Sequence, residues 1–138
     1  MSNRILGLLA ALVPVLTSNA WAQGATAKEP VADGRTLSQW VKELKEGVAP
    51  QTRNAAAYEI SGMGPAAAPA VPALVEALDD PEASVKFPVI VALGEIGPAA
   101  KAAVPKLKKM MDEEINDEIA AAAKRALRRI EPSAATSE

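Results

Sequence analysis

The chain has 138 residues, of which 49% are hydrophobic but only 3% aromatic, and its formal net charge is −2. This length fits one domain, the hydrophobic content is too high for a disordered chain, and the small negative charge gives no general attraction to nucleic acid. Cysteine and histidine are both absent, which excludes disulfides, zinc sites built on these residues and histidine acid–base catalysis.

The first 22 residues have the features of a signal peptide. Arg4 supplies a positive start, Ile5–Leu16 is an apolar run of 12 residues, and Ala20-Trp21-Ala22 places small residues where a signal peptidase cuts. We predict cleavage between Ala22 and Gln23, and therefore an exported protein that is periplasmic or secreted. The alternative is a membrane anchor, but the run is shorter than the ~20 residues that span a bilayer. We therefore expect no membrane span after cleavage.

Two segments flank the predicted domain. Residues 23–33 are small and polar without any periodicity, and we predict a flexible spacer there. Residues 132–138 have a similar composition and are predicted to form a disordered tail. The structured domain is therefore predicted to cover residues 34–131.

A repeat of 33–34 residues lies within this domain. Gly64-Pro65-Ala66-Ala67 matches Gly97-Pro98-Ala99-Ala100, and Ala70-Val71-Pro72 matches Ala103-Val104-Pro105. Apolar residues recur at steps of three and four, which is the spacing of one helix face, and each Gly-Pro pair ends a helix. Three copies of two helices predict six helices, over Thr36–Glu46, Pro50–Gly62, Ala67–Asp79, Pro81–Ile96, Ala100–Asp112 and Asn116–Ile130.

The fourth of these helices carries two further signals. Pro88 lies inside it, so the helix loses the bond to the Ser84 carbonyl and should kink. We place Pro88 on the solvent side. Phe87, Ile90 and Val91 form a second apolar side, as expected for a middle element with neighbours on both flanks. Asp80 is expected to cap the start of this helix.

Because one helix pair cannot bury its own apolar face, we expect the pairs to stack into a short solenoid. The repeated unit, seen as Arg53–Leu74 and again as Lys86–Leu107, resembles HEAT repeats, in particular the short type found in phycobilin-lyase proteins. This resemblance implies an all-α fold, an α–α superhelix of about three antiparallel helix pairs. It also implies an ionic ladder between repeats, with Asp79 and Asp112 as the acidic members and Arg53 and Lys86 as the basic ones.

The resemblance further implies a non-catalytic scaffold that binds another protein and needs no cofactor. The alternative is a subunit or relative of a phycobilin-lyase-like enzyme; nucleic-acid binding is not expected. Binding is expected on the concave face, which the resemblance assigns to the first, third and fifth predicted helices. The residues expected to point outward there are Gln39, Lys42, Glu43, Ala73, Glu76, Ala77, Lys106, Lys109 and Met110.

Three other features have both a functional and a structural interpretation. The acidic residues in 112–118 could serve acid–base chemistry or bind a divalent cation, but they also suit the positive end of the last helix. The basic residues in 124–129 could contact phosphate, but they also offset the negative end of that helix. Trp40 is expected in the core rather than at an exposed binding site.

Overall fold

The computed structural model describes residues 28–136, so the predicted signal peptide at 1–22 lies outside the described residues. Within residues 28–136, six α-helices joined by short turns and 3-10 helices confirm the all-α prediction. The α-helices are α2 (Leu37–Glu46), α3 (Pro50–Gly62), α4 (Val71–Ala77), α5 (Ala83–Ile96), α6 (Val104–Glu113) and α7 (Asp117–Ile130). The remaining elements are β1 (Val31–Ala32), β2 (Arg35–Thr36), η1 (Gly64–Ala70), η2 (Gly97–Ala103) and η3 (Pro132–Ala135).

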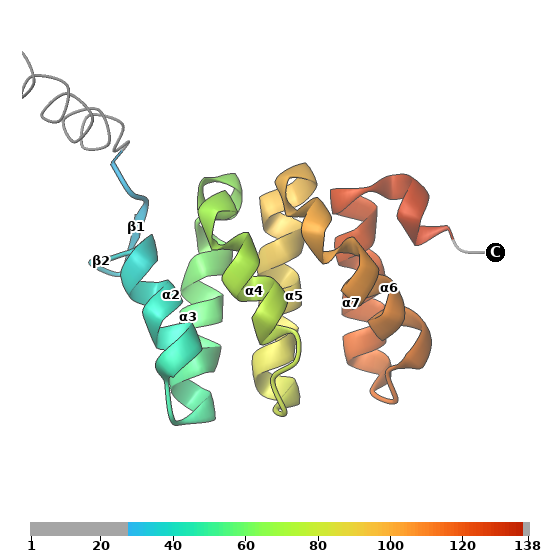
Figure 1. Ribbon diagram of the computed structural model, residues 1–138, viewed down its shortest axis with the longest axis horizontal. Coiled ribbons are helices and arrows are strands. Elements are labelled where there is room, and N and C mark those ends of the chain that lie inside the picture. Colours follow the sequence, from blue (N-terminus) through green and yellow to red (C-terminus); the bar gives the residue numbers. More distant parts are fainter. Residues whose placement is uncertain (1–27, 137–138) are drawn as a thin grey trace, which may run out of the picture.

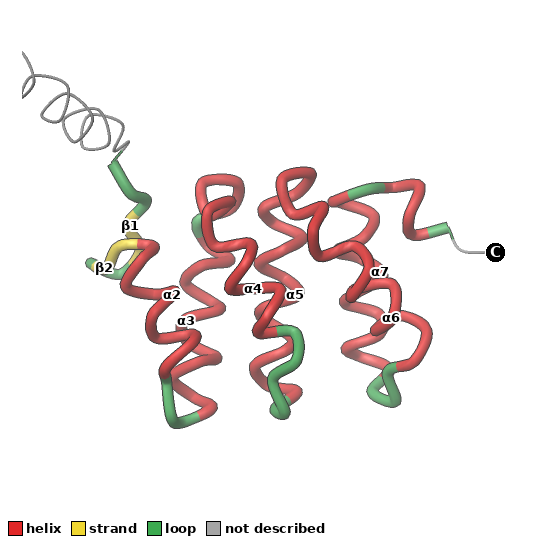
Figure 2. The backbone as a smooth tube through the Cα atoms, in the orientation of Figure 1, coloured by secondary structure: helices red, strands yellow, loops and turns green. Residues whose placement is uncertain are grey.

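The helices form two layers that run along the solenoid (Figure 1). One layer holds α3, α5 and α7, in which α5 packs closely against both neighbours, and the other holds α2, α4 and α6, which make only sparse contacts among themselves. As names only, we call the closely packed layer of α3, α5 and α7 the inner layer and the layer of α2, α4 and α6 the outer layer. The short turns within the pairs lie at one end of the helices, and η1 and η2 lie at the opposite end (Figure 2).

The Gly-Pro segments reverse the chain between repeats. Gly64 and Gly97 have φ values of +57° and +76°, which glycine adopts without the steric cost of a side chain. Beyond them, residues 67–70 and 100–103 form 3-10 helix, where the sequence predicts α-helix. Pro72 and Pro105 explain the difference, because they have no N–H with which to extend the α-helical pattern backward.

The core runs along the middle of the solenoid and is rich in alanine. Ala57, Leu74, Leu93, Leu107 and Leu127 all have no exposed surface. Alanine at the helix contacts allows a close approach of the backbones, and leucine and isoleucine fill the space between the layers. The core thus connects all three repeats into one continuous unit.

Helix α5 is the central element and is apolar on most of its surface. The stretch Ala83–Glu113 is long and apolar enough to cross a membrane by length and composition, but 56% of its most apolar window is buried inside the protein. It comprises α5, η2 and α6, with a chain reversal at Gly97. Its apolar character therefore has a structural explanation in the packing of α5 between α3 and α7.

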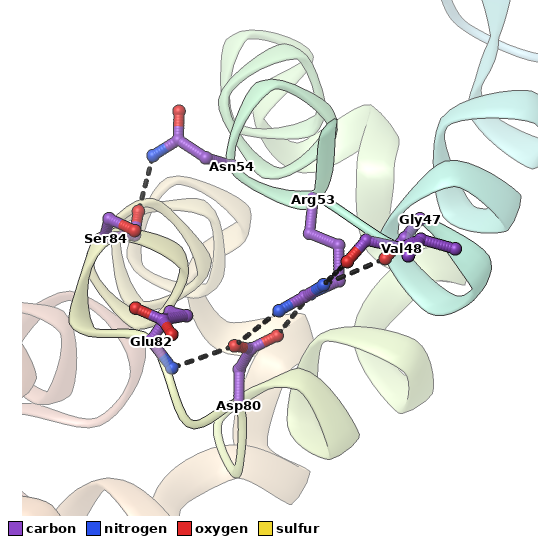
Figure 3. Close-up of polar contacts among 7 residues, drawn as sticks. All are labelled: Gly47, Val48, Arg53, Asn54, Asp80, Glu82 and Ser84. Atoms are coloured by element: carbon purple, nitrogen blue, oxygen red, sulfur yellow. Dashed lines mark hydrogen bonds and ion pairs between the residues drawn. The ribbon is translucent and has the colours of Figure 1, made fainter. Parts of the chain in front are cut away.

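Pro88 lies inside α5, which runs as a single helix from Ala83 to Ile96. Pro88 has no N–H to donate to the Ser84 carbonyl. This carbonyl instead accepts a hydrogen bond from Nδ2 of Asn54 in α3 (Figure 3). The proline ring is fully buried, so the prediction that it faces solvent is wrong. The neighbouring repeat therefore supplies the donor that α5 lacks.

The amino-terminal end differs from the predicted flexible spacer. Residues 31–36 form a hairpin in which Val31 pairs with Thr36, and Nε1 of Trp40 donates to the Ala32 carbonyl at 2.9 Å. Trp40 itself is 6% exposed, which confirms its place in the core. Two-residue strands are too short to show an alternating pattern, so the sequence gives no sign of the hairpin.

The carboxyl-terminal end differs in a similar way from the predicted tail. Residues 132–135 form the 3-10 helix η3, which packs against α7. Ala134 and Ala135 are each 6% exposed. Each end of the described chain therefore carries a short element that is not part of the repeat.

Candidate functional site

The nine residues predicted to bind a partner lie along the outer layer. Ala73, Glu76 and Ala77 line a groove of about 360 Å³ between α2 and α4. Lys106, Lys109 and Met110 line a second groove of about 600 Å³ beside α6. The three residues on α2, namely Gln39, Lys42 and Glu43, line neither groove.

One detail of the predicted surface is corrected by the structure. Ala73 is only 8% exposed, because the neighbouring helix α2 covers it, so it does not point outward. The other eight residues lie on α2, α4 and α6, the helices that were predicted to carry them. Both layers have the same apolar period, and only the distances between their helices distinguish the inner layer from the outer one.

The charges of the outer layer are largely paired with one another. Lys45 lies 3.7 Å from Glu76 across the first groove, and Nζ of Lys106 lies 2.5 Å from Asp79. Lys109 pairs with Glu113 at 3.9 Å in the same helix. These pairs are mostly exposed and contribute little to stability. They also leave this surface with few free charges for a partner.

An ionic ladder does connect the repeats, but through different acids from those predicted (Figure 3). Arg53 contacts Asp80 in two places, Nε to Oδ2 at 2.7 Å and Nη2 to Oδ1 at 3.1 Å. Lys86 contacts Glu114 at 3.3 Å. The predicted acids were Asp79 and Asp112. The acids used lie within the turns, where the backbone conformation and not the helical period sets the side-chain direction.

The Arg53–Asp80 pair is the most buried part of this ladder. The two side chains are 15% and 8% exposed, and Arg53 also donates to the carbonyls of Gly47 and Val48. Burial raises the pKa of Asp80, but the bonds from Arg53 and from the Glu82 N–H outweigh it and leave the pKa below its usual value. The pair therefore joins the α2–α3 turn to the α4–α5 turn and serves stability.

The acidic residues around the start of α7 have structural roles. Oδ1 of Asn116 caps the helix by accepting from the N–H groups of Glu118 and Ile119 at 3.0 and 3.2 Å. Asp117 and Glu118 lie in the first turn, where negative charge is favourable. Among the described residues, no group of three or more acidic side chains could hold a metal ion.

The inner layer presents a different surface, which was not predicted from the sequence. Tyr58, Val91 and Arg125 occupy equivalent repeat positions on α3, α5 and α7. Tyr58 is 57% exposed, and both Phe87 and Val91 are half-buried. Of the three residues expected between neighbouring helices, Ile90 is fully buried. Phe87 and Val91 are only partly covered, and they line the face that α3 and α7 leave open.

This face is hollowed along α5. A groove of about 440 Å³ lies between α5 and α7, and a second of about 360 Å³, lined by Tyr58 and Phe87, lies toward the start of α5. Arg125 and Arg128 line the groove between α5 and α7 and are exposed. Within residues 28–136, neither of them forms an ion pair. The spacing of 33 and 34 residues between positions 58, 91 and 125, which is the repeat length, is the signal that could have identified this surface.

The fold and the repeat pattern agree with the comparison to known families. The family model for HEAT repeats matches residues 37–128, and a search of curated proteins finds no significant match. The matched region runs from the start of α2 almost to the end of α7. The chain therefore belongs to the HEAT-repeat family.

Proposed function

We propose that this protein is an exported protein-binding module and that its inner layer is the binding surface. HEAT repeats generally mediate protein–protein interactions, and the family is typically non-catalytic. The proposal adds two finer points to this family role, namely the location of the protein and the face that contacts the partner.

The contrast between the two layers is the observation that supports the inner surface. On the outer layer, Lys45, Lys106 and Lys109 pair with acidic side chains. The inner layer instead exposes Tyr58, partly exposes Phe87 and Val91, and adds Arg125 and Arg128, which form no ion pair within residues 28–136. Aromatic residues and arginine are enriched at protein interfaces, and lysine and glutamate are depleted. The inner layer therefore has the composition of an interface, and the outer layer that of a solvated surface.

Site-specific crosslinking in intact cells tests the binding face. A photoreactive amino acid at Tyr58 or Ala121 on the inner layer should give a discrete crosslinked product that mass spectrometry identifies as protein. The same amino acid at Gln39 or Lys42 is the matched control on the outer layer and should give little product. Products from the outer positions alone would reverse the proposed face, and products from neither would contradict a protein-binding role.

Export rests on the sequence pattern of residues 1–22. Mass spectrometry of the protein from its cellular location should find a mature amino terminus within one or two residues of Gln23. Replacing Ala20 and Ala22 by arginine should block this cleavage, because the peptidase requires small residues there. An intact Met1 terminus in cytoplasmic protein would contradict export.

A further inference from the structure

The groove between α5 and α7 has an apolar floor. Ile90, Val91 and Gly94 line it from α5, and Ala122 and Ala126 line it from α7. The helices approach closely at this point, because a Cβ atom added at Gly94 would lie 3.3 Å from the Cα of Ala126. The small residues thus let α5 and α7 pack closely beneath the groove, and Val91 is the apolar side chain of the floor that is partly exposed.

One rim of the groove is strongly basic. Arg125 and Arg128 line it from α7, and both are exposed and carry no ion pair with any residue in 28–136. Arg129 also lines the groove, but its Nη1 lies 2.5 Å from Oε1 of Glu95. Toward the start of α7 the charge changes sign, because Asp117 and Glu118 lie in the first turn. The basic side chains therefore lie at this groove, and the acidic residue Glu118 lines the separate groove toward the start of α5.

We infer that this groove binds an amphipathic helical segment of a partner protein whose apolar side chains are flanked by acidic residues. Apolar side chains at positions i and i+4 of such a segment would lie over Val91 and the seam between α5 and α7, and the acidic residues would pair with Arg125 and Arg128. The inference rests on the proposed function and adds the chemistry of the partner.

Other occupants fit the groove less well. Nucleic acid needs a larger set of basic contacts and no apolar floor, and the acidic residues of the first turn of α7 would repel phosphate. A second copy of this chain packed face to face about a twofold axis would bring its own Arg125 and Arg128 toward those of the first copy. An apolar segment with acidic flanking residues would pack on the apolar floor and pair with the arginines of the rim.

Selection from a random peptide library by display tests the inference with a defined probe. The mature protein should enrich peptides that combine apolar residues at helical spacing with two or more acidic residues. The double variant Arg125→Glu/Arg128→Glu should bind these peptides about tenfold more weakly or worse. The matched control, Lys101→Glu/Lys108→Glu, changes the net charge equally at two exposed lysines away from the groove, and it should bind them as the wild type does.

A charge swap makes the test specific to the rim. Peptides whose acidic residues are replaced by lysine should lose binding to the wild type and regain it with Arg125→Glu/Arg128→Glu. Selected peptides that bind both proteins equally would overturn the inference, as would retention on heparin that depends on the two arginines while no peptide is enriched. If no peptide is enriched but Tyr58 crosslinks to a protein, the partner chemistry is wrong and the proposed function stands.

Discussion

The side chain of Asn54 is predicted to stabilise the protein only as long as Pro88 is present. Its Nδ2 donates to the Ser84 carbonyl, which receives no hydrogen bond from residue 88 because proline has no N–H. We expect Asn54→Ala to lower the free energy of unfolding by about 1 kcal/mol, the net value of one such hydrogen bond. Ser84 is exposed, so water can replace the lost donor, and the cost should stay well below that of a buried unsatisfied group.

Pro88→Ala is expected to have a small net effect on its own. Removal of a proline from a helix interior is worth up to ~3 kcal/mol, but Asn54 already offsets about 1 kcal/mol of that penalty. The ring is fully buried, and deleting its two outer carbons costs about 1–2 kcal/mol. Taken together, these effects should change the free energy of unfolding by no more than about 1 kcal/mol.

The double variant distinguishes the hydrogen bond from general packing. Pro88→Ala introduces a backbone N–H that can donate to Ser84, so Asn54→Ala should cost almost nothing in that background, and the coupling energy should be about 1 kcal/mol. Urea denaturation, followed by the circular-dichroism signal of the helices, gives the free energy of unfolding of the wild type, the two single variants and the double variant. Gln51→Ala, an exposed change on the same helix, is the control and should stay within about 0.5 kcal/mol. Equal costs of Asn54→Ala in both backgrounds would refute the explanation.

Three further predictions concern stability. Because the pKa of Asp80 is lower in the folded state than its unfolded value of about 3.9, its pairing with Arg53 stabilises the protein above that pH and is lost as the pH falls below it. Asp80→Asn should lower the free energy of unfolding by ~2 kcal/mol at neutral pH. As the pH falls, the variant should lose less of this free energy than the wild type, and equal pH dependence of the two proteins would contradict the prediction. Gly94→Ala should destabilise the protein by about 1 kcal/mol, measured by thermal denaturation, because the added Cβ meets the backbone of Ala126 at 3.3 Å. This cost should exceed the gain from the better helix propensity of alanine, and a stabilised variant would show that α7 can move. Ala73→Glu should lower the melting temperature, because the site is 8% exposed, and an unchanged value would restore the sequence-based view that this residue points outward.

Much of the fold could be predicted because the repeat carries its own signals. The Gly-Pro pairs mark the reversals at Gly64 and Gly97, and the apolar steps of three and four give the buried faces of the helices. The helix ends shift by a few residues where proline removes a donor, as at Pro72 and Pro105. Hydrogen bonding in the first turn decides these limits, and apolar spacing does not report on it.

The candidate surface was less predictable, for two physical reasons. Side chains in the turns take their direction from the local backbone, so Asp80 rather than Asp79 meets Arg53. The inner and outer layers also have similar apolar periods, and the difference in packing between them depends on how closely alanine and glycine let α5 approach α3 and α7. Tyr58 gave no signal of its own, because a single tyrosine in a helix fits a buried position as well as an exposed one.

The two short elements at the ends of the stack have a consequence for how long the solenoid can be. The hairpin at residues 31–36 covers Trp40 at one end, and η3 packs onto α7 at the other. Neither element continues the repeat, so a second molecule would have to displace it to add a helix pair in register, and open-ended growth into filaments is disfavoured. Any lengthening of the array, in evolution or by engineering, would have to duplicate an internal unit such as residues 71–103 between the closed ends.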